Sequence, residues 1–215
     1  MDVNGKSFRL VNSCVAMHNP LDNLRKHHIY LASKSPRRRQ LLVMLDIDFD
    51  IAPVVEVDES YPPHLVADKA ACHIASKKAE AYSQLIIDEP DALVITADTI
   101  VVCDDVILGK PADNDEARTM LRKLSGKKHK VVTGVAITSA RHRDIFSDTT
   151  TVAFRKLDDN EIRYYVEHYS PLDKAGAYGI QEWIGAAAVD EMRGSFYNVM
   201  GLPVEMLYKR LRLVK

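Results

Sequence analysis

Three consecutive arginines, Arg37 to Arg39, stand where they can hold an anion. They directly follow Ser35-Pro36, which a short apolar segment precedes. Serine is a favoured helix N-cap and proline suits the first helical position, so a helix should begin here. The free N–H groups and the dipole of a helix N-terminus attract phosphate, and guanidinium groups add further donors. The segment therefore predicts a phosphate-binding site.

Arg38 is the arginine best placed to face inward. It precedes Leu41, Leu42 and Leu45 by three, four and seven residues, so it shares their apolar face, whereas Arg39 points elsewhere. A solvated helix face would also explain a basic triplet. The position at a helix start favours the anion site.

Lys78 interrupts the apolar face of a long helix that we predict from about His64 to Ile86. At 100° per residue, Lys77 points about 100° away from Lys78. A snorkelling lysine is one interpretation. The other is that an inward cation needs an anionic partner, and a polyphosphate would serve. Six apolar residues lie within about 60° of Lys78 on the same helix: Ala71, Ile74, Ala75, Ala81, Tyr82 and Leu85.

Asp98 ends a short apolar segment, Ala92 to Ala97, which we predict to be a buried strand. A hairpin closed at Asp104-Asp105 would bring Lys110 back beside Asp98. On spacing alone, a structural salt bridge explains that pairing equally well. A carboxylate at the end of a buried strand is also where a metal ligand or a general base is expected.

Acidic residues cluster after a second predicted strand, residues 47–55. Hard divalent cations, which accompany triphosphates, prefer such oxygen ligands. Glu59 is the candidate metal ligand, and Asp58 is its alternative. A solvated acidic loop would explain the same cluster without a metal.

A segment rich in Gly and Ala, Asp173 to Gln181, would let a ligand approach the backbone closely. Gln181 carries both a donor and an acceptor, so it could read the edge of a pyrimidine. Trp183 follows nearby, and we expect it to pack against the protein rather than to stack on a ligand.

Composition narrows the class of partner. The chain has 215 residues, 47% of them hydrophobic, and a formal net charge of -1, which suits one large domain or two small lobes. A near-neutral chain creates no strong field, so a compact phosphate ligand is expected rather than a polymeric nucleic acid. The three cysteines lack metal-ligand spacing and fit reduced thiols. With no apolar segment of the roughly 18 to 20 residues that a membrane span needs, a cytoplasmic location is expected.

The remaining pattern alternates helices with strands around these residues. We treat residues 1–28 as an N-terminal extension, for which a flexible segment and a short surface helix are both open, and residues 29–215 as one domain. The first strand is expected at residues 29–32. The second half should contain helices at 114–124 and 158–168, strands at 129–139 and 145–154, and a terminal helix with Val204, Leu207 and Leu211 on its inner face.

These motifs together resemble the Maf family of nucleoside triphosphate pyrophosphatases, over about residues 29–211. The opening signature Leu-Ala-Ser-x-Ser-Pro-Arg-Arg, followed by Leu-Leu, spans Leu31–Leu42. Further landmarks follow in family order: Ala97-Asp98-Thr99, Gly109-Lys110-Pro111, Leu124-Ser125-Gly126, Val132-Thr133-Gly134, Asp173–Gln181 and Gly194–Pro203. The resemblance implies an α/β fold with a mixed, bent sheet flanked by helices, and two lobes around a cleft, similar to the Maf and inosine triphosphatase-like fold.

The resemblance also implies an activity. Water would attack the α-phosphorus of dTTP, UTP or modified uridine triphosphates in a reaction that depends on Mg²⁺ or Mn²⁺, giving a monophosphate and diphosphate. The tract Ala175–Gln181 is similar to that of the dTTP/UTP branch, whose members remove unwanted nucleotides and are often homodimers. The residues implied are Asp98, Lys110 and Arg38 for catalysis; Ser33, Arg37, Arg38, Lys78, Lys110 and Gln181 for substrate binding; and Glu59 and Asp98 for the metal.

Two alternatives remain open. The sister branch of the family resembles 7-methyl-GTP pyrophosphatases and shares the phosphate-binding residues. A non-catalytic, nucleotide-binding regulator of septum formation is the second, although a regulator has no need of a positioned base. Glu182-Trp183 stands where the family more often has Gly, which puts the shape of the adjoining loop in question.

Overall fold

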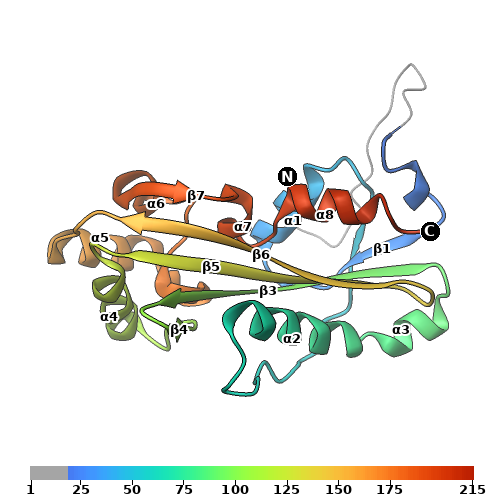
Figure 1. Ribbon diagram of the computed structural model, residues 1–215, viewed down its shortest axis with the longest axis horizontal. Coiled ribbons are helices and arrows are strands. Elements are labelled where there is room, and N and C mark those ends of the chain that lie inside the picture. The colour runs from blue at the N-terminus through green and yellow to red at the C-terminus, as the bar shows by residue number, and fades with distance from the viewer. Residues whose placement is uncertain (1–18) are drawn as a thin grey trace.

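The computed structural model describes residues 19–215, which form a mixed α/β structure around a seven-stranded sheet (Figure 1). The strand order is β2-β1-β3-β5-β6-β7, and β4 pairs with β3. β1 is parallel to both β2 and β3, whereas the other pairings are antiparallel. The strands are β1 His28–Leu31, β2 Asp50–Ile51, β3 Ala92–Cys103, β4 Val106–Leu108, β5 Lys128–Thr138, β6 Arg143–Phe154 and β7 Val189–Arg193.

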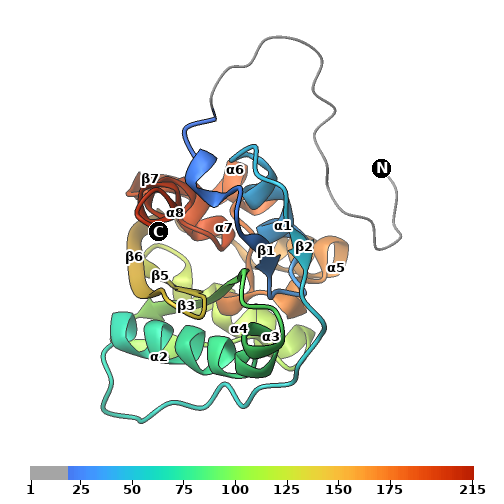
Figure 2. The ribbon, with the colours of Figure 1, turned by 90° about the vertical axis from the view of Figure 1, so that its right-hand side faces the viewer.

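Helices cover both faces of the long strands. Figure 2 shows α2 and α3 on one face, and α7 and α8 on the other. The bounds are α1 Pro36–Val43, α2 Ala67–Glu80, α3 Ser83–Asp88, α4 Asn114–Leu124, α5 Asp159–Tyr169, α6 Trp183–Ala188, α7 Phe196–Met200 and α8 Val204–Leu211, with 3₁₀ turns at Asp22–Leu24, Pro171–Asp173 and Ala175–Ala177. Within the described part of the chain, no helix is both long and apolar enough to cross a membrane.

Most predicted elements are confirmed, and two of the predicted helices begin at a side-chain cap. α4 begins after Asp113, whose side chain accepts hydrogen bonds from Asp115 and Glu116. α5 begins with a capping box formed by Asp158 and Glu161. The predicted hairpin is also present, because β3 and β4 are joined by the two-residue turn Asp104-Asp105. The mixed α/β class is therefore confirmed, whereas the division into two lobes stays a prediction.

Two predicted elements were wrong in extent. The strand expected over residues 47–55 is only β2, because it lies at the sheet edge and pairs only with the last residues of the four-residue β1. The helix expected from His64 to Ile86 begins only at Ala67 and is broken at Tyr82. The buried Tyr82 leaves helical geometry there, and its hydroxyl donates to the Pro53 carbonyl oxygen at 2.9 Å.

Part of the predicted N-terminal extension contributes to the core. Leu21 and Leu24 are buried in the same apolar cluster as Leu207 and Leu211 of α8. The Asn23 amide donates to two carbonyl oxygens at the C-terminal end of α8 and just after it, those of Leu211 and Val214, at 2.9 Å each. Residues 1–18, which complete the predicted extension, lie outside the described residues.

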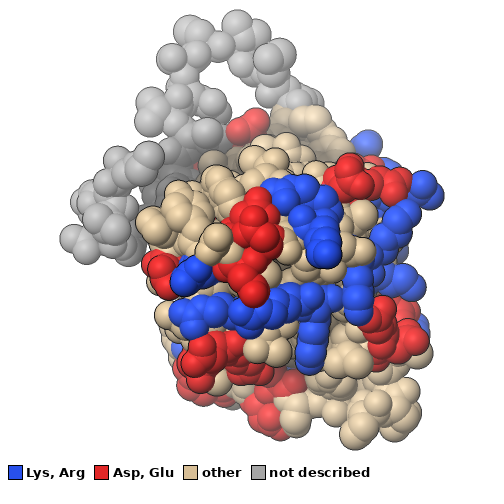
Figure 3. Space-filling model, turned by 90° about the vertical axis from the view of Figure 1, so that its left-hand side faces the viewer, with Lys and Arg blue, Asp and Glu red and all other residues tan. Residues whose placement is uncertain are grey.

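The end of the molecule formed by α4, α5 and β7 carries a band of Lys and Arg bordered by Asp and Glu (Figure 3). Exposed ion pairs contribute little to stability, but each places a negative charge beside a positive one and so weakens the electric field of this band. The ion pairs at this end include Lys127–Asp104, Lys128–Glu191, Arg122–Asp159 and Arg155–Glu161.

Gly134 allows α2 to lie directly against β5. A Cβ atom at this position would lie 2.3 Å from the backbone carbonyl of Ala71 on α2, which no rotamer change can relieve. We expect Gly134→Ala to lower the free energy of unfolding by about 2–3 kcal/mol, because α2 must move off the sheet. Urea denaturation measures this. Gly109→Ala is the control, because its Cβ would meet nothing within 4 Å; equal losses in both variants would contradict the close approach.

His129 makes the stability of the protein depend on pH. Burial lowers its pKa to about 4, from 6.5, and its Nε2 lies 2.8 Å from the Tyr178 hydroxyl. The unfolded chain therefore takes up a proton on His129 as the pH falls from about 6.5 to 4, while the folded protein resists. We expect His129 to account for a loss of about 3 kcal/mol of stability over this window.

The test compares the wild type with His129→Phe by urea denaturation at pH 7, 5.5 and 4.5. The variant starts less stable, because the bond to Tyr178 is lost, but its stability should fall less between pH 7 and pH 4.5. Parallel pH profiles would show that His129 does not carry the effect.

Candidate active site

The candidate site lies at a gap along one edge of β3. β1 pairs with β3 only as far as Ile95, and β4 begins to pair with it at Val101. In the described chain, no strand occupies that edge between these two pairings. A cavity of about 480 Å³ lies here, beyond the carboxyl end of β1, and its lining includes the start of α1. Ligands of open α/β sheets characteristically bind beyond the carboxyl ends of the strands.

Arg38 closes part of this gap. Its Nη1 donates to the Ala97 carbonyl oxygen at 2.9 Å, and its Nη2 donates to Thr99 Oγ1 at 3.1 Å. Its Nε donates to the Gly201 carbonyl oxygen at 2.7 Å, and a longer contact of 3.5 Å joins Nη1 to Ser33 Oγ. Burial lowers the pKa of Arg38 from its usual value, while the nearby Asp98 opposes that shift. Arg38 thus faces inward as predicted, but several of its donors hold protein atoms.

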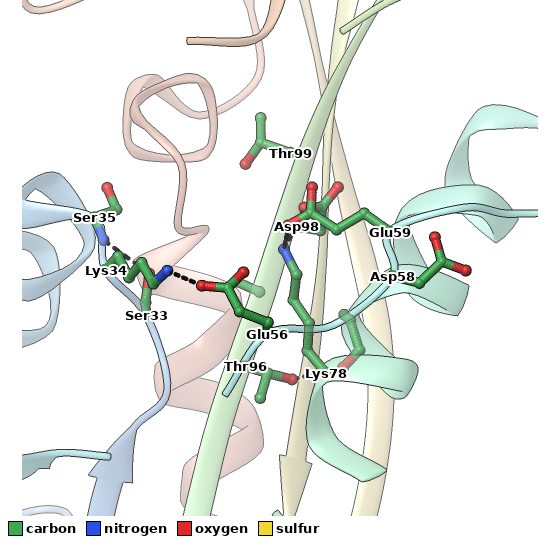
Figure 4. Close-up of polar contacts among 12 residues, drawn as sticks. Ser33, Lys34, Ser35, Glu56, Asp58, Glu59, Lys78, Thr96, Asp98 and Thr99 are labelled. Carbon is green, nitrogen blue, oxygen red and sulfur yellow. Dashed lines mark hydrogen bonds and ion pairs between the residues drawn. The ribbon is translucent and has the colours of Figure 1, made fainter. Parts of the chain in front are cut away.

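α2 is fixed on the sheet at the point from which Lys78 extends. The buried Thr96 hydroxyl donates to the Ala75 carbonyl oxygen of α2 at 2.7 Å. The close approach at Gly134, which is the β5 partner of Asp98, brings the helix near the same point of the sheet. Lys78 therefore extends from a helix that is held against the sheet, and its side chain reaches toward Asp98 (Figure 4).

Lys78 lies between two carboxylates, as Figure 4 shows. Its Nζ is 2.7 Å from Asp98 Oδ1 and 2.7 Å from Glu59 Oε1. The side chains of Lys78 and Asp98 are only 17% and 12% exposed, so solvent screens this contact weakly. Burial alone would raise the pKa of Glu59, but Lys78, with smaller contributions from Lys110 and Arg38, brings it below its usual value. The predicted inward cation is confirmed, and its partners here are carboxylates.

Asp58 belongs to a different set of contacts. Hydrogen bonds from Ser60, followed by one from Lys77, lower the pKa of Asp58 to about 2. Lys77 Nζ lies 3.1 Å from Asp58 Oδ2, and the Asp58 side chain is 71% exposed. Glu59 lines the cavity and Asp58 does not. Of the two metal candidates, the structure thus places only Glu59 beside Asp98.

Arg37 and Ser33 line the same cavity at the start of α1. Arg37 Nη1 lies 2.8 Å from Asp173 Oδ2, and the other oxygen of Asp173 lies 2.7 Å from Lys174 Nζ. Ser33 Oγ accepts a hydrogen bond from the Ser35 backbone N–H at 3.2 Å. Arg37, one of the two arginines predicted to bind phosphate, is therefore paired with a carboxylate of the protein, that of Asp173.

Lys110 and Gln181 complete the predicted set around the cavity. The hairpin returns Lys110 to the cavity, but the lysine paired with Asp98 is Lys78 rather than the expected Lys110. The Lys110 side chain is exposed and contributes positive charge near Glu59. Gln181 lies on the loop before α6, and Trp183 packs edge-on against Tyr164, which confirms its packing role.

The sequence did not reveal the polar chain behind Arg38. Thr99 Oγ1 lies 3.0 Å from Thr133 Oγ1, and Thr133 donates to the Asn198 carbonyl oxygen at 3.0 Å. Since Thr133 uses its proton on Asn198, Thr99 donates to Thr133 and accepts from Arg38. Sequence reasoning also missed the buried Lys174, for which a lysine inside an otherwise small and apolar tract was the available signal.

The donor set suits a hard cation. Glu59 and Asp98 already share one cation, the ammonium group of Lys78, and carboxylate oxygens are preferred ligands of Mg²⁺ and Mn²⁺. Among residues 19–215, no three His, Cys, Asp or Glu side chains are grouped to hold a metal by themselves. Glu59 and Asp98 are the paired carboxylates of the cavity that fit such an ion.

A mixed sheet with arginines, lysines and paired carboxylates around a cavity at a strand terminus defines a phosphate-binding α/β protein. The chain belongs to the Maf family, because the Maf-like protein family model matches residues 28–214.

Bacterial relatives match most of the chain. A protein of Parabacteroides distasonis is 52% identical over 192 residues, which cover 89% of this chain and 98% of the relative. One of Porphyromonas gingivalis is 51% identical over 89% of this chain and 96% of its own length. One of Bacteroides fragilis is 48% identical over 89% and 98%. Each of the three is named dTTP/UTP pyrophosphatase.

Proposed function

We propose that this chain hydrolyses dTTP and UTP, together with modified uridine triphosphates, to the nucleoside monophosphate and diphosphate. The observation that carries the proposal is Lys78 held between Asp98 and Glu59, beside the start of α1 and in the same cavity as Gln181. The shared name of the relatives supports this activity. The cations suit the triphosphate, and the amide suits the base.

In this proposal, Arg37, Lys78 and Lys110 hold the phosphates, with Arg38 and Ser33 close to them. A triphosphate brings negative charge that competes with Asp98 for Lys78 and with Asp173 for Arg37. Asp98 is then free to accept a proton from water, whose oxygen bonds to the α-phosphorus. The bond from this phosphorus to the bridging oxygen of the β-phosphate breaks, and diphosphate leaves with the electron pair.

Glu59 and Asp98 are the residues proposed to hold Mg²⁺ or Mn²⁺. When bound, the ion would neutralise charge that develops on the phosphate oxygens. We propose that residues 29–215 form the domain that carries this activity. The protein would act in the cytoplasm. A homodimer would fit the family resemblance.

The direct test is diphosphate release from a panel of nucleoside triphosphates with Mg²⁺, with Mn²⁺ and with a chelator. We expect rapid release from dTTP and UTP, little from CTP, ATP and GTP, and loss of release with the chelator. Preferred hydrolysis of 7-methyl-GTP would instead place the chain in the sister branch. Binding of dTTP or UTP without any release would favour the regulator.

A further inference from the structure

Glu182 occupies the position where the Maf resemblance more often has Gly. It precedes α6, and its side chain is only 18% exposed. A partly buried carboxylate is stabilised by partners, and Glu182 has them: its Oε2 accepts a hydrogen bond from the Tyr165 hydroxyl, and its Oε1 lies 3.2 Å from Lys174 Nζ. These contacts come from different parts of the chain, so the carboxylate is fixed in position.

The two anchors of Glu182 are themselves held. The Tyr165 hydroxyl accepts the Gly179 backbone N–H at 3.0 Å, and the Lys174 side chain is only 9% exposed. Burial, reinforced by the bond to Glu182, raises the pKa of Tyr165. Tyr165 therefore keeps its proton and remains a donor to Glu182 at physiological pH.

The fixed carboxylate sets the orientation of the Gln181 amide. Gln181 Nε2 donates to Glu182 Oε1 at 3.4 Å. A carboxylate only accepts hydrogen bonds, so it must face the NH₂ branch of the amide, and Gln181 Oε1 takes the other branch. Gly179 makes room for this pair, because a Cβ there would lie 2.8 Å from Gln181 Nε2 and 2.8 Å from Glu182 Cδ.

A fixed amide distinguishes two pyrimidine edges. Uracil and thymine offer an N3–H donor beside the O4 acceptor, which match the Oε1 acceptor and the remaining N–H of Gln181. Cytosine offers an N3 acceptor beside an N4–H₂ donor, so it would need the amide turned over. Turning it over would place Gln181 Oε1 against the Glu182 carboxylate, with two acceptors facing each other.

We propose that Glu182 is a positioning residue that makes the site accept uracil and thymine and reject cytosine, by fixing the amide of Gln181. The inference rests on the proposed function, because it assumes that Gln181 meets the base. It explains why a chain in this family can carry a buried Glu at a position where Gly is more usual.

The test measures kcat/KM for UTP and CTP in the wild type, Glu182→Gln and Gly179→Ala. A glutamine at 182 can present either branch of its own amide, and an alanine at 179 displaces the pair without changing any charge. In both variants we expect the UTP:CTP ratio of kcat/KM to fall at least ~10-fold, because the amide of Gln181 is no longer held in the orientation that favours uracil over cytosine. Glu205→Gln, on the exposed surface of α8, is the matched control and should keep the wild-type ratio.

Equal losses for UTP and CTP in both variants would overturn the inference, because a purely structural role lowers both alike. If Glu182→Gln fails to fold, Gly179→Ala still decides by the same ratio. Gln181→Ala distinguishes a failure of the role of Glu182 from a failure of the proposed function. If it loses discrimination while Glu182→Gln and Gly179→Ala keep it, only the role of Glu182 fails. If Gln181→Ala keeps discrimination, or the wild type releases no diphosphate, the proposed function fails.

Discussion

Replacing Asp98 with asparagine should lower kcat for diphosphate release from dTTP by about 10²- to 10⁴-fold, the range typical of removing a general base. Asparagine keeps the shape of the side chain but cannot accept the proton from water. Lys78 keeps its second partner, Glu59, so the site should stay assembled. We therefore expect a much smaller change in KM than in kcat. Steady-state release of diphosphate measures kcat and KM, and a thermal unfolding curve for each protein checks that it is folded.

Asp58→Asn is the control for this prediction. Asp58 belongs to the same acidic segment as Glu59, but it pairs with Lys77 and does not line the cavity. Its replacement should leave kcat within about 2-fold of the wild type. Near wild-type turnover in Asp98→Asn would show that another group accepts the proton.

Lys78→Met should damage both binding and stability. Methionine retains an apolar stem of similar length but leaves Glu59 and Asp98 facing each other without their shared cation. KM for dTTP should rise at least ~10-fold, because a phosphate ligand is lost. The free energy of unfolding should fall by about 2 kcal/mol at pH 7, less than for a fully buried pair because Glu59 is half-exposed.

The stability loss in Lys78→Met should grow with pH. In the wild type, the lowered pKa of Glu59 gives stability that is present above its unfolded pKa and disappears as the pH falls through the folded value. In the variant this contribution is absent, because Glu59 has lost the cation that lowers its pKa. The difference in free energy of unfolding between the two proteins should therefore be smallest below the folded pKa of Glu59 and reach its full size above the ordinary pKa of 4.5.

Lys77→Met is the matched control, because it lies next to Lys78 on the same helix. Its partner Asp58 is exposed, and surface ion pairs of this kind contribute little. We expect a change within about 0.5 kcal/mol and a pH profile parallel to that of the wild type. Equal destabilisation by both lysine variants would contradict the special position of Lys78.

Elements that carry local signals could be predicted from the sequence. α4 has the same bounds in prediction and structure because Asp113 caps it and its apolar residues recur at helical spacing. Lys78 could be assigned to an inner face by periodicity alone. The break at Tyr82 could not be predicted in this way, because the hydrogen bond that accompanies it is to Pro53, 29 residues earlier in the chain.

For the site residues, too, the local position could be predicted but the contacts with distant segments could not. Arg38 could be placed at a helix start facing inward, but its bonds to Ala97 and Gly201 depend on how β3 and α7 meet α1. The partners of Lys78 likewise come from two distant segments. Glu182 was noticed only as a departure from the family pattern, because its contacts with Tyr165 and Lys174 exist only after the loop has folded.

The contact between the two ends of the described chain affects the order in which the protein can be completed during synthesis. Leu21 and Leu24 emerge from the ribosome well before Leu207 and Leu211, the α8 residues that cover them. Asn23 likewise cannot bond to Leu211 and Val214 until these two residues have been made. The apolar surface formed by Leu21 and Leu24 must therefore stay uncovered while residues 25–206 are made, and its closure has to wait for α8.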